Sequence, residues 1–290
     1  MSNSDQIQRI LFDDLDIRGV VSGLEQTCQD CFENHNYPPL IRKILGEMLA
    51  AVSLLSTNLK FEGKLILQAQ APGNVRLLMA ECTHTHDLRA IARFDEAPDD
   101  SLAFAELLDA GQMMLTIEPL IGNRYQGIVP LNGADLAECL ESYFVSSEQL
   151  ATQVQLACDG ERAAGMMLQV LPVSGGGEED WARVSHLAST LKEEELLHLD
   201  NQTLLYRLFH EENCRLYEAD EVRFNCTCSR ERSEASLKLV GKDELLEALD
   251  EQGVINVNCQ FCNAEYSFDL ADIEMIFSGV IASEESKDIH

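Results

Sequence analysis

Two close pairs of cysteines in the C-terminal part of the chain constrain its structure more than any other feature. The first pair is Cys226 and Cys228, the second is Cys259 and Cys262, and residues 229–258 separate them. Two such pairs, brought together by a loop, can surround one Zn²⁺ ion with four thiolates in a tetrahedron. The first pair has only one residue between its cysteines, and it can also close into a small, strained disulfide ring. The same residues therefore suit a metal site when reduced and disulfides when oxidised.

The segment around these cysteines is too small to bury a large core. We expect a helix at residues 243–249, a strand at residues 266–268 and a closing helix at residues 272–277. Zinc binding contributes about 10–16 kcal/mol of apparent folding free energy in such units, which equals or exceeds the stability of a typical domain, about 5–15 kcal/mol. Loss of the metal should therefore unfold this segment. Arg230 and Arg232 are placed to offset the negative charge of four thiolates around one Zn²⁺.

Two roles for the zinc remain open at this point. Oxidation of the sulfurs would remove the ligands and release the metal, which would make the site a redox switch. An inert structural zinc is the competing interpretation, and spacing alone favours it.

The composition is strongly acidic. The formal net charge is −29 over 290 residues, and acidic residues outnumber basic ones in every part of the chain. Such a chain repels phosphate backbones and anionic lipids, so we expect neither a nucleic-acid nor a membrane partner. The apolar stretch from Ile44 to Leu59 is interrupted by Glu47 and falls short of a membrane span. Ten cysteines without a visible secretory signal indicate a reducing cytoplasm.

The spacing of apolar residues predicts an α+β domain with largely antiparallel sheets over residues 1–177. Much of residues 1–60 reads as helical, with a broad apolar face from Ile41 to Leu55 that begins after Pro38 and Pro39. Alternating patterns then predict three hairpins separated by helices. The hairpins are expected within residues 65–79, 113–130 and 153–171, and the helices at residues 102–108 and 134–144.

A change of pattern after Gly175–Gly177 predicts a flexible joint followed by a helical linker, residues 178–221. Helical spacing runs from Trp181 to Phe209, with Asp200 as the N-cap between two short helices. These helices are apolar on one side and densely acidic on the other, so their stability should depend on docking to a partner surface. Residues 222–290 form the zinc-binding third part.

The remaining cysteines favour packing roles. A thioredoxin-type pair should follow a strand and open a helix, whereas Cys28 and Cys31 lie on one helical face with apolar neighbours. We therefore favour buried thiols over a redox pair, and their role stays open. Four isolated cysteines are also expected to be packing residues: Cys82, Cys139, Cys158 and Cys214.

Two other groups of residues offer weaker signals. Cys82, His84 and His86 would place three ligands on one strand face, but no fourth ligand follows, so a loop with solvated histidines is favoured. Residues 124–127 could bind a ligand, and turn geometry with a core tyrosine explains them equally well. No nucleophile elbow, phosphate-binding loop or H-E-x-x-H motif occurs, so we predict no catalytic residues and no enzyme.

The chain resembles the redox-regulated 33-kDa heat-shock chaperone family over nearly its whole length. The run C-T-C-S-R-E-R from Cys226 to Arg232 carries the resemblance, together with C-Q-F-C from Cys259 to Cys262. All four zinc ligands of the family map onto cysteines here. Weaker matches lie at residues 124–127, 147–149, 165–172 and 207–212.

The resemblance implies a cytoplasmic, ATP-independent chaperone that holds unfolding client proteins. It implies an inactive reduced form with one Zn²⁺ on Cys226, Cys228, Cys259 and Cys262. By the same analogy, peroxide with mild heat, or hypochlorous acid, forms the disulfides Cys226–Cys228 and Cys259–Cys262 and releases the zinc. The small domain and the linker then unfold, apolar surface becomes free for clients, and the oxidised form dimerises.

Two other functions compete with this hypothesis. A zinc-ribbon regulator would bind a protein or nucleic acid while it holds the metal. A thiol–disulfide oxidoreductase would use one of the cysteine pairs to turn over a disulfide substrate.

Overall fold

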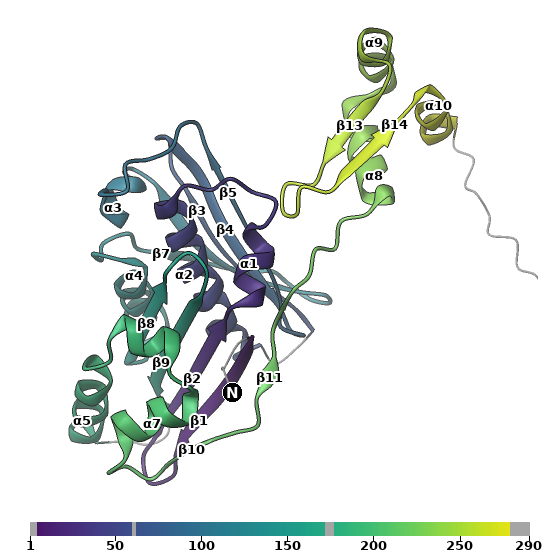
Figure 1. Cartoon of the computed structure of the whole chain (residues 1–290). Helices are drawn as coiled ribbons and strands as arrows, with labels where there is room; N and C mark the ends of the chain where they lie inside the picture. Colours follow the sequence, from purple (N-terminus) through teal and green to yellow (C-terminus); the bar gives the residue numbers. More distant parts are fainter. Residues whose placement is uncertain (1–4, 60–61, 172–176, 279–290) are drawn as a thin grey trace, which may run out of the picture. The chain divides into compact units, whose positions relative to one another are not determined.

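The structure, a computed structural model, describes residues 5–59, 62–171 and 177–278. It divides into two compact units, residues 1–225 (unit 1) and 226–290 (unit 2), and most of their elements are labelled in Figure 1. The predicted glycine joint falls partly outside the described residues, at Gly175 and Gly176. Gly177 is described and caps the helix that follows.

Unit 1 contains two six-stranded sheets. Sheet A has the strand order β10-β1-β2-β9-β8, with β11 also paired to β1, and sheet B has the order β12-β5-β4-β3-β6-β7. Neighbouring strands are antiparallel except β12 and β5, which are parallel. Sheet A consists of β1 (Gln6–Phe12), β2 (Ile17–Leu24), β8 (Thr152–Cys158), β9 (Ala163–Val170), β10 (Cys214–Leu216) and β11 (Asp220–Glu221). Sheet B consists of β3 (Gly63–Gln70), β4 (Val75–Thr83), β5 (Asp87–Phe94), β6 (Gln112–Pro119), β7 (Tyr125–Val129) and β12 (Arg223–Phe224). The α+β class and the three predicted hairpins are confirmed.

The prediction that much of residues 1–60 is helical is wrong for the first part, because β1 and β2 are strands. Sheet A is covered on both faces, so these strands carry apolar residues on both sides and lose the alternation that marks a half-exposed strand. Ile7 and Val20 face the core around the central helix, whereas Ile10 and Val21 face the other core. A fully buried strand of this kind cannot be separated from a helix by periodicity alone.

The central helix α2 (Pro39–Ser56) packs against strands of both sheets, and most of its residues are buried. It begins at Pro39, close to the predicted start after the two prolines, because a proline at the first helical position gives up no intrahelical hydrogen bond. Close approach to sheet A depends on Gly165 of β9, where a Cβ would lie 2.8 Å from Leu54 Cδ1. The shorter helices of unit 1 are α1 (Gln26–Phe32), α3 (Phe104–Leu107), α4 (Leu136–Tyr143) and the π-helix at Phe144–Glu148.

Three linker helices cover the second face of sheet A: α5 (Glu178–Ser189), α6 (Glu193–His198) and α7 (Asn201–Phe209). Asp200 is the N-cap of α7, as predicted, and its Oδ1 accepts a hydrogen bond from the Thr203 backbone N–H at 2.8 Å. The apolar sides of these helices form one core with the strands. Its buried members are Ile10, Phe12, Ile17, Val21, Ala157, Ala164, Met166, Leu168, Val184, Ala188, Leu196, Leu204, Leu205, Leu208 and Phe209.

Residues 220–225, called the strap below, run from sheet A to sheet B immediately before Cys226. β11 pairs with β1, and β12 pairs with β5. Between them Val222 is 1% exposed, and its N–H donates to the Asp5 carbonyl at 3.0 Å. The strap is therefore an integral edge of both sheets.

Unit 2 has a small core. Its elements are α8 (Arg230–Val240), α9 (Lys242–Gln252), β13 (Ile255–Asn258), β14 (Glu265–Phe268) and α10 (Leu270–Ser278). The buried members of its core are Leu237, Leu245, Leu249, Phe268 and Ile273. The predicted helix at residues 243–249, strand at 266–268 and helix at 272–277 are confirmed, whereas α8 and β13 were not predicted.

Candidate metal centre

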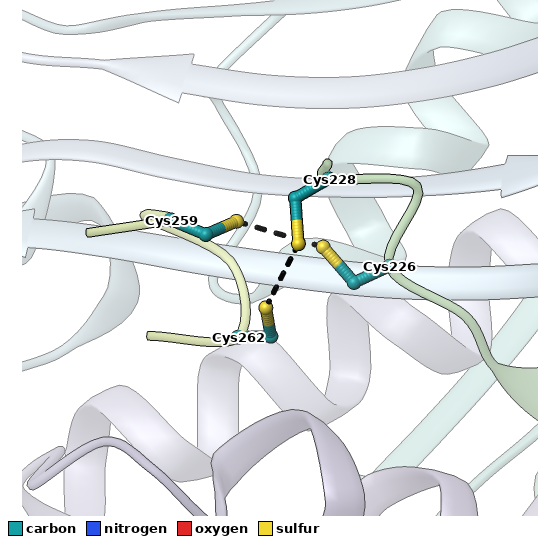
Figure 2. Close-up of side chains that lie close together, drawn as sticks. All are labelled: Cys226, Cys228, Cys259 and Cys262. Carbon is teal, nitrogen blue, oxygen red and sulfur yellow. Dashed lines mark hydrogen bonds between the residues drawn. The ribbon is translucent and has the colours of Figure 1, made fainter. Parts of the chain in front are cut away.

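The structure brings the four C-terminal cysteines together in unit 2. Figure 2 shows their sulfurs pointing toward one another, and all four lie within 4.8 Å of one another. Cys226 Sγ is 3.6 Å from Cys259 Sγ, and Cys228 Sγ is 3.4 Å from Cys262 Sγ. Within residues 5–59, 62–171 and 177–278, this is the one group of three or more His, Cys, Asp or Glu side chains that lie close enough together to hold a metal ion.

Local backbone structure positions each pair. Cys259 and Cys262 lie at the turn between β13 and β14, where Cys259 N–H donates to Ala264 O at 2.8 Å. Asn263 N–H donates to Cys259 O at 2.8 Å, and Asn263 adopts the left-handed conformation (φ +59°) that a tight turn requires. Cys226 and Cys228 precede α8. Its N-cap Ser229 accepts a hydrogen bond from Arg232 N–H, which fixes where the helix begins.

The sulfur positions fit a tetrahedral ion. Zn–S bonds of about 2.3 Å in a tetrahedron place neighbouring sulfurs about 3.8 Å apart. The measured separations of 3.4 and 3.6 Å, with every pair within 4.8 Å, agree with such a site after small adjustments. A set of four thiols is also the donor set that structural zinc prefers.

Neighbouring side chains support the cluster. Tyr266 of β14 donates its hydroxyl to Cys228 Sγ at 3.2 Å, and this hydrogen bond raises the pKa of Tyr266 to about 12. Arg232 Nη1 donates to the Thr227 carbonyl at 2.7 Å, which holds the residue between the first two cysteines. Sequence reasoning missed Tyr266. The one sequence feature that could have indicated its role is its position in the hairpin that carries the second cysteine pair.

Arg230 stabilises the core beneath the site. Its guanidinium carbon lies 4.3 Å from the centre of the Phe268 ring, and Nη1 donates to Ser267 O at 2.8 Å. Nη2 is paired with Asp272 of α10 at 2.8 Å. These contacts join α8, β14 and α10, so Arg230 stabilises the packing of unit 2 around the site.

The cysteines differ in acidity. Burial raises the pKa of Cys226 and Cys262. Burial also acts on Cys259, but the backbone N–H groups of Cys262 and Phe261 donate to its sulfur and hold its pKa at about 7. Without a metal, Cys259 therefore ionises more readily than Cys226 and Cys262.

The other sequence candidates do not join this site. Cys28 and Cys31 lie in α1 at 0% and 1% exposure, which confirms that their thiols are buried. Cys82 is buried in β4, His84 is exposed in the following turn, and the His86 ring hydrogen-bonds to Ser56 Oγ. Of the isolated cysteines, Cys82, Cys139 and Cys158 are buried and Cys214 is half-buried.

Residues 124–127 support local packing at β7. The hydroxyls of Tyr125 and Tyr143 are 3.3 Å apart, and Gly127 lies directly against the Tyr143 ring. The buried tyrosine of this contact is Tyr143 of α4, whereas Tyr125 is 47% exposed.

The fold and the site together define a class of protein: an α+β body covered by acidic linker helices and followed by a small unit whose four clustered cysteines could hold a metal ion. A sequence model of the family described as Hsp33 protein matches residues 5–269. The chain belongs to this family, which is a family of chaperones and not a class of enzymes.

Individual relatives agree with this assignment. A 33 kDa chaperonin of Pseudomonas paraeruginosa (strain DSM 24068 / PA7) is 48% identical over 288 residues, covering 96% of each chain. A 33 kDa chaperonin of Shewanella loihica is 44% identical over 275 residues, covering 95% of this chain and 96% of the relative. The crystal structure of a 33 kDa chaperonin (heat shock protein 33 homologue) from Thermotoga maritima has the same fold, with a TM-score of 0.81 at 21% identity over 94% of this chain and 97% of that one. Among the described residues, no helix has the length and apolarity to cross a membrane.

Proposed function

We propose that this protein is a redox-regulated, ATP-independent chaperone of the holdase type, inactive when reduced and zinc-bound. In this proposal residues 1–177 hold clients, residues 178–221 form a redox-responsive linker, and residues 222–290 form the zinc-binding switch. The partners are unfolding proteins in the cytoplasm, and the oxidised form is a homodimer. The observation that carries the proposal is the cluster of four sulfurs in a unit with a small core.

The reduced state depends on the four cysteines as ligands. A bound Zn²⁺ would supply a charge centre that keeps the four sulfurs as thiolates and links the two pairs. Cys226 and Cys228 lie just before α8, and Cys259 and Cys262 lie in the β13–β14 turn, so one site joins the start of unit 2 to its hairpin. Tyr266 keeps Cys228 in position through its hydroxyl.

Oxidation removes this link. Each pair, Cys226 with Cys228 and Cys259 with Cys262, gives up two electrons and forms one disulfide. One molecule of hydrogen peroxide accepts those two electrons and leaves as two molecules of water. A sulfur bonded to another sulfur is a poor ligand, so the metal is released.

Loss of the metal leaves unit 2 with a core of five buried apolar side chains among its described residues, 226–278, too few to stabilise it alone. The linker helices depend on their apolar sides for docking, and their clustered carboxylates favour hydration once released. Release uncovers the apolar face of sheet A, which includes Phe12, Ile17 and Leu168. Unfolding clients would bind such a surface through apolar contacts, while the net charge of −29 keeps the complex dissolved.

One experiment tests the proposal directly. Reduced, zinc-loaded protein is titrated with hydrogen peroxide at mild heat, while zinc release, far-ultraviolet circular dichroism and suppression of client aggregation are followed together. We expect the three signals to change in parallel in the wild type and in a Cys214→Ser control, whose altered thiol lies outside the cluster. Fully oxidised, zinc-free protein that fails to protect a thermally unfolding enzyme would refute the assignment.

A further inference from the structure

Strand β7 is an edge of sheet B. Among the described strands it pairs with β6 alone, in an antiparallel register that runs from Tyr125 opposite Ile117 to Val129 opposite Met113. It lies beside α4 in Figure 1. The outer side of such a strand, called the β7 edge below, presents N–H and C=O groups to which a further strand can bind.

The other long edge in unit 1 is covered. β8 ends sheet A, and α4 and α6 both pack against it. The Val154 N–H of β8 donates to the Glu141 carboxylate of α4 at 2.7 Å, which occupies part of that edge. β10, β11 and β12 have only two or three residues each. With five residues, β7 is the longest uncovered edge strand in the described part of unit 1.

Apolar side chains lie on both faces of β7. Val129 belongs to the core around α2, and successive side chains alternate, so Ile128 points away from α2. Ile128 is 68% exposed, and Tyr125 on the other face is half exposed. The turn before β7 adds Leu120 and Ile121, of which Ile121 is 94% exposed. The β7 edge therefore combines main-chain groups with exposed apolar side chains.

The usual protection of an edge strand is missing from β7. Natural edge strands carry lysines, prolines or bulges that prevent further pairing. The sequence Y-Q-G-I-V of β7 has no charge and no proline, and its register with β6 is continuous. The strand is suited to β-augmentation, in which an extended peptide adds to a sheet through main-chain hydrogen bonds and alternate side chains.

Charge and size indicate the occupant. Residues 119–134 contain no acidic residue and one basic residue, Arg124, in a chain with a net charge of −29. A second folded copy would bring another charge of −29, and five residues of strand give far less contact than the roughly 800 Å² per partner of a stable interface. An unfolded apolar segment with few acidic residues meets neither obstacle.

We propose that the β7 edge binds one extended apolar segment of an unfolding client as an additional strand of sheet B. This inference rests on the proposed holdase function and adds the mode of recognition. Because the main chain of the segment pairs with β7, binding tolerates many sequences, as a holdase requires. Alternate apolar side chains of the segment contact Ile128 on one face and Tyr125 on the other.

The β7 edge does not depend on the linker. The core beneath α5, α6 and α7 contains no residue of sheet B among those that the structure describes. Reduced protein should therefore bind an isolated segment, weakly, because the contact is small. Oxidation uncovers the face of sheet A as a second contact, and two contacts on one client hold it more tightly than either alone.

Binding of a designed peptide to reduced, zinc-loaded, full-length protein tests the proposal. The probe is a fluorescein-labelled ten-residue peptide in which valine or isoleucine alternates with threonine, with a lysine at each end. We expect saturable binding by fluorescence anisotropy, and slower hydrogen exchange of the amides of residues 125–129 in the complex. A peptide that fails to bind, or that binds without protecting these amides, would overturn the proposal.

Two substitutions with the same change of charge locate the site. Ile128→Lys removes the exposed apolar side chain and places a charge on the β7 edge, so the dissociation constant of the peptide should rise by about tenfold. Leu239→Lys adds the same charge at an 89% exposed position of unit 2 and should leave the constant unchanged. Equal constants in the two variants would contradict the site. If Ile128→Lys fails to fold, the exchange protection in the wild type decides the proposal.

Further outcomes separate this inference from the proposed function. Oxidised wild type that suppresses client aggregation, while the peptide protects no amide of residues 125–129, would refute client binding at the β7 edge alone. Protection of these amides in a protein whose oxidised form protects no client would support the edge and refute the holdase role. A dimer of reduced protein that sedimentation detects and Ile128→Lys dissociates would assign the edge to a second copy and overturn the proposal.

Discussion

The ring of Phe209 packs edge to face against the ring of Phe12, with centroids 5.2 Å apart and an interplanar angle of 84°. Phe12 ends β1 and Phe209 ends α7, and each is 1% exposed. The contact attaches the linker helices to sheet A at the end of their apolar stripe. Because the outer sides of these helices are acidic and solvated, docking depends on a few buried contacts of this kind.

Phe209→Ala should undock the linker without oxidation. Removing a buried phenylalanine costs about 3–5 kcal/mol, a large part of what holds short helices to a sheet. We expect a red shift in the fluorescence of Trp181, the one tryptophan of the chain, which packs against the same core from α5. We also expect suppression of client aggregation by reduced protein that still holds its zinc.

Tyr206→Ala is the matched control, since Tyr206 is on the same helix but 72% exposed. It should leave fluorescence and activity unchanged. If Phe209→Ala releases the linker and yet binds no client, the face of sheet A beneath the linker is not the client surface.

The second prediction concerns the strap, residues 220–225. Val222→Ala removes two buried methyl groups and should destabilise unit 1 by about 2 kcal/mol. Arg223→Ala breaks the 2.7 Å pair with Asp87 near the surface and should destabilise unit 1 less than the Val222 change does. Urea unfolding measures both values, and hydrogen exchange at residues 220–225 locates the change. Arg223→Ala proving the more harmful of the two would mean that the strap is held by its charge pair.

The sequence predicted an element correctly where its pattern of residues is compatible with only one kind of secondary structure. The hairpins at β3–β4, β6–β7 and β8–β9 alternate apolar residues between short turns, and Asp200 stands where a helix must begin. It failed for β1 and β2, because burial of both faces removes the alternation. The strap was missed since β11 and β12 have two residues each and pair with strands distant in sequence.

The candidate site was likewise predicted in part and missed in part. Cysteine spacing was enough to predict that four sulfurs meet, because few other arrangements satisfy two close pairs. Tyr266 and the contacts of Arg230 depend on how β14 and α8 pack, which spacing does not encode.

Tyr266→Phe should weaken the metal centre while leaving the fold of unit 2 intact. The substitution removes the hydroxyl that donates to Cys228 Sγ and keeps the ring. Loss of a hydrogen bond to a metal ligand lowers affinity by 10–100-fold in general, and because this one is near the surface we expect about tenfold. Competition with a chromogenic chelator measures the affinity. Unchanged zinc affinity together with an unchanged rate of zinc release by peroxide would show that the hydroxyl has no role in the reduced site.

Glu47 of α2 should make stability fall as pH rises. Burial raises its pKa to about 7, Lys43 at 3.9 Å opposes the shift, and the like charges of Asp135 and Glu193 add to it. In the unfolded chain the carboxyl ionises near its ordinary pKa of about 4.3. Between these values the native state binds more protons than the unfolded state, so stability declines from about pH 4 to pH 7 and is then lower by about 3 kcal/mol.

Replacing this carboxyl tests the sign of that pH dependence. Urea unfolding of Glu47→Gln should give a stability difference from wild type that grows in favour of the variant between pH 4 and pH 8. Glu194→Gln removes the same charge from an exposed position on α6 and should show no such growth. If the Glu47→Gln difference is constant over this range, Glu47 is ionised in the native state throughout, and its pairing with Lys43 outweighs its burial.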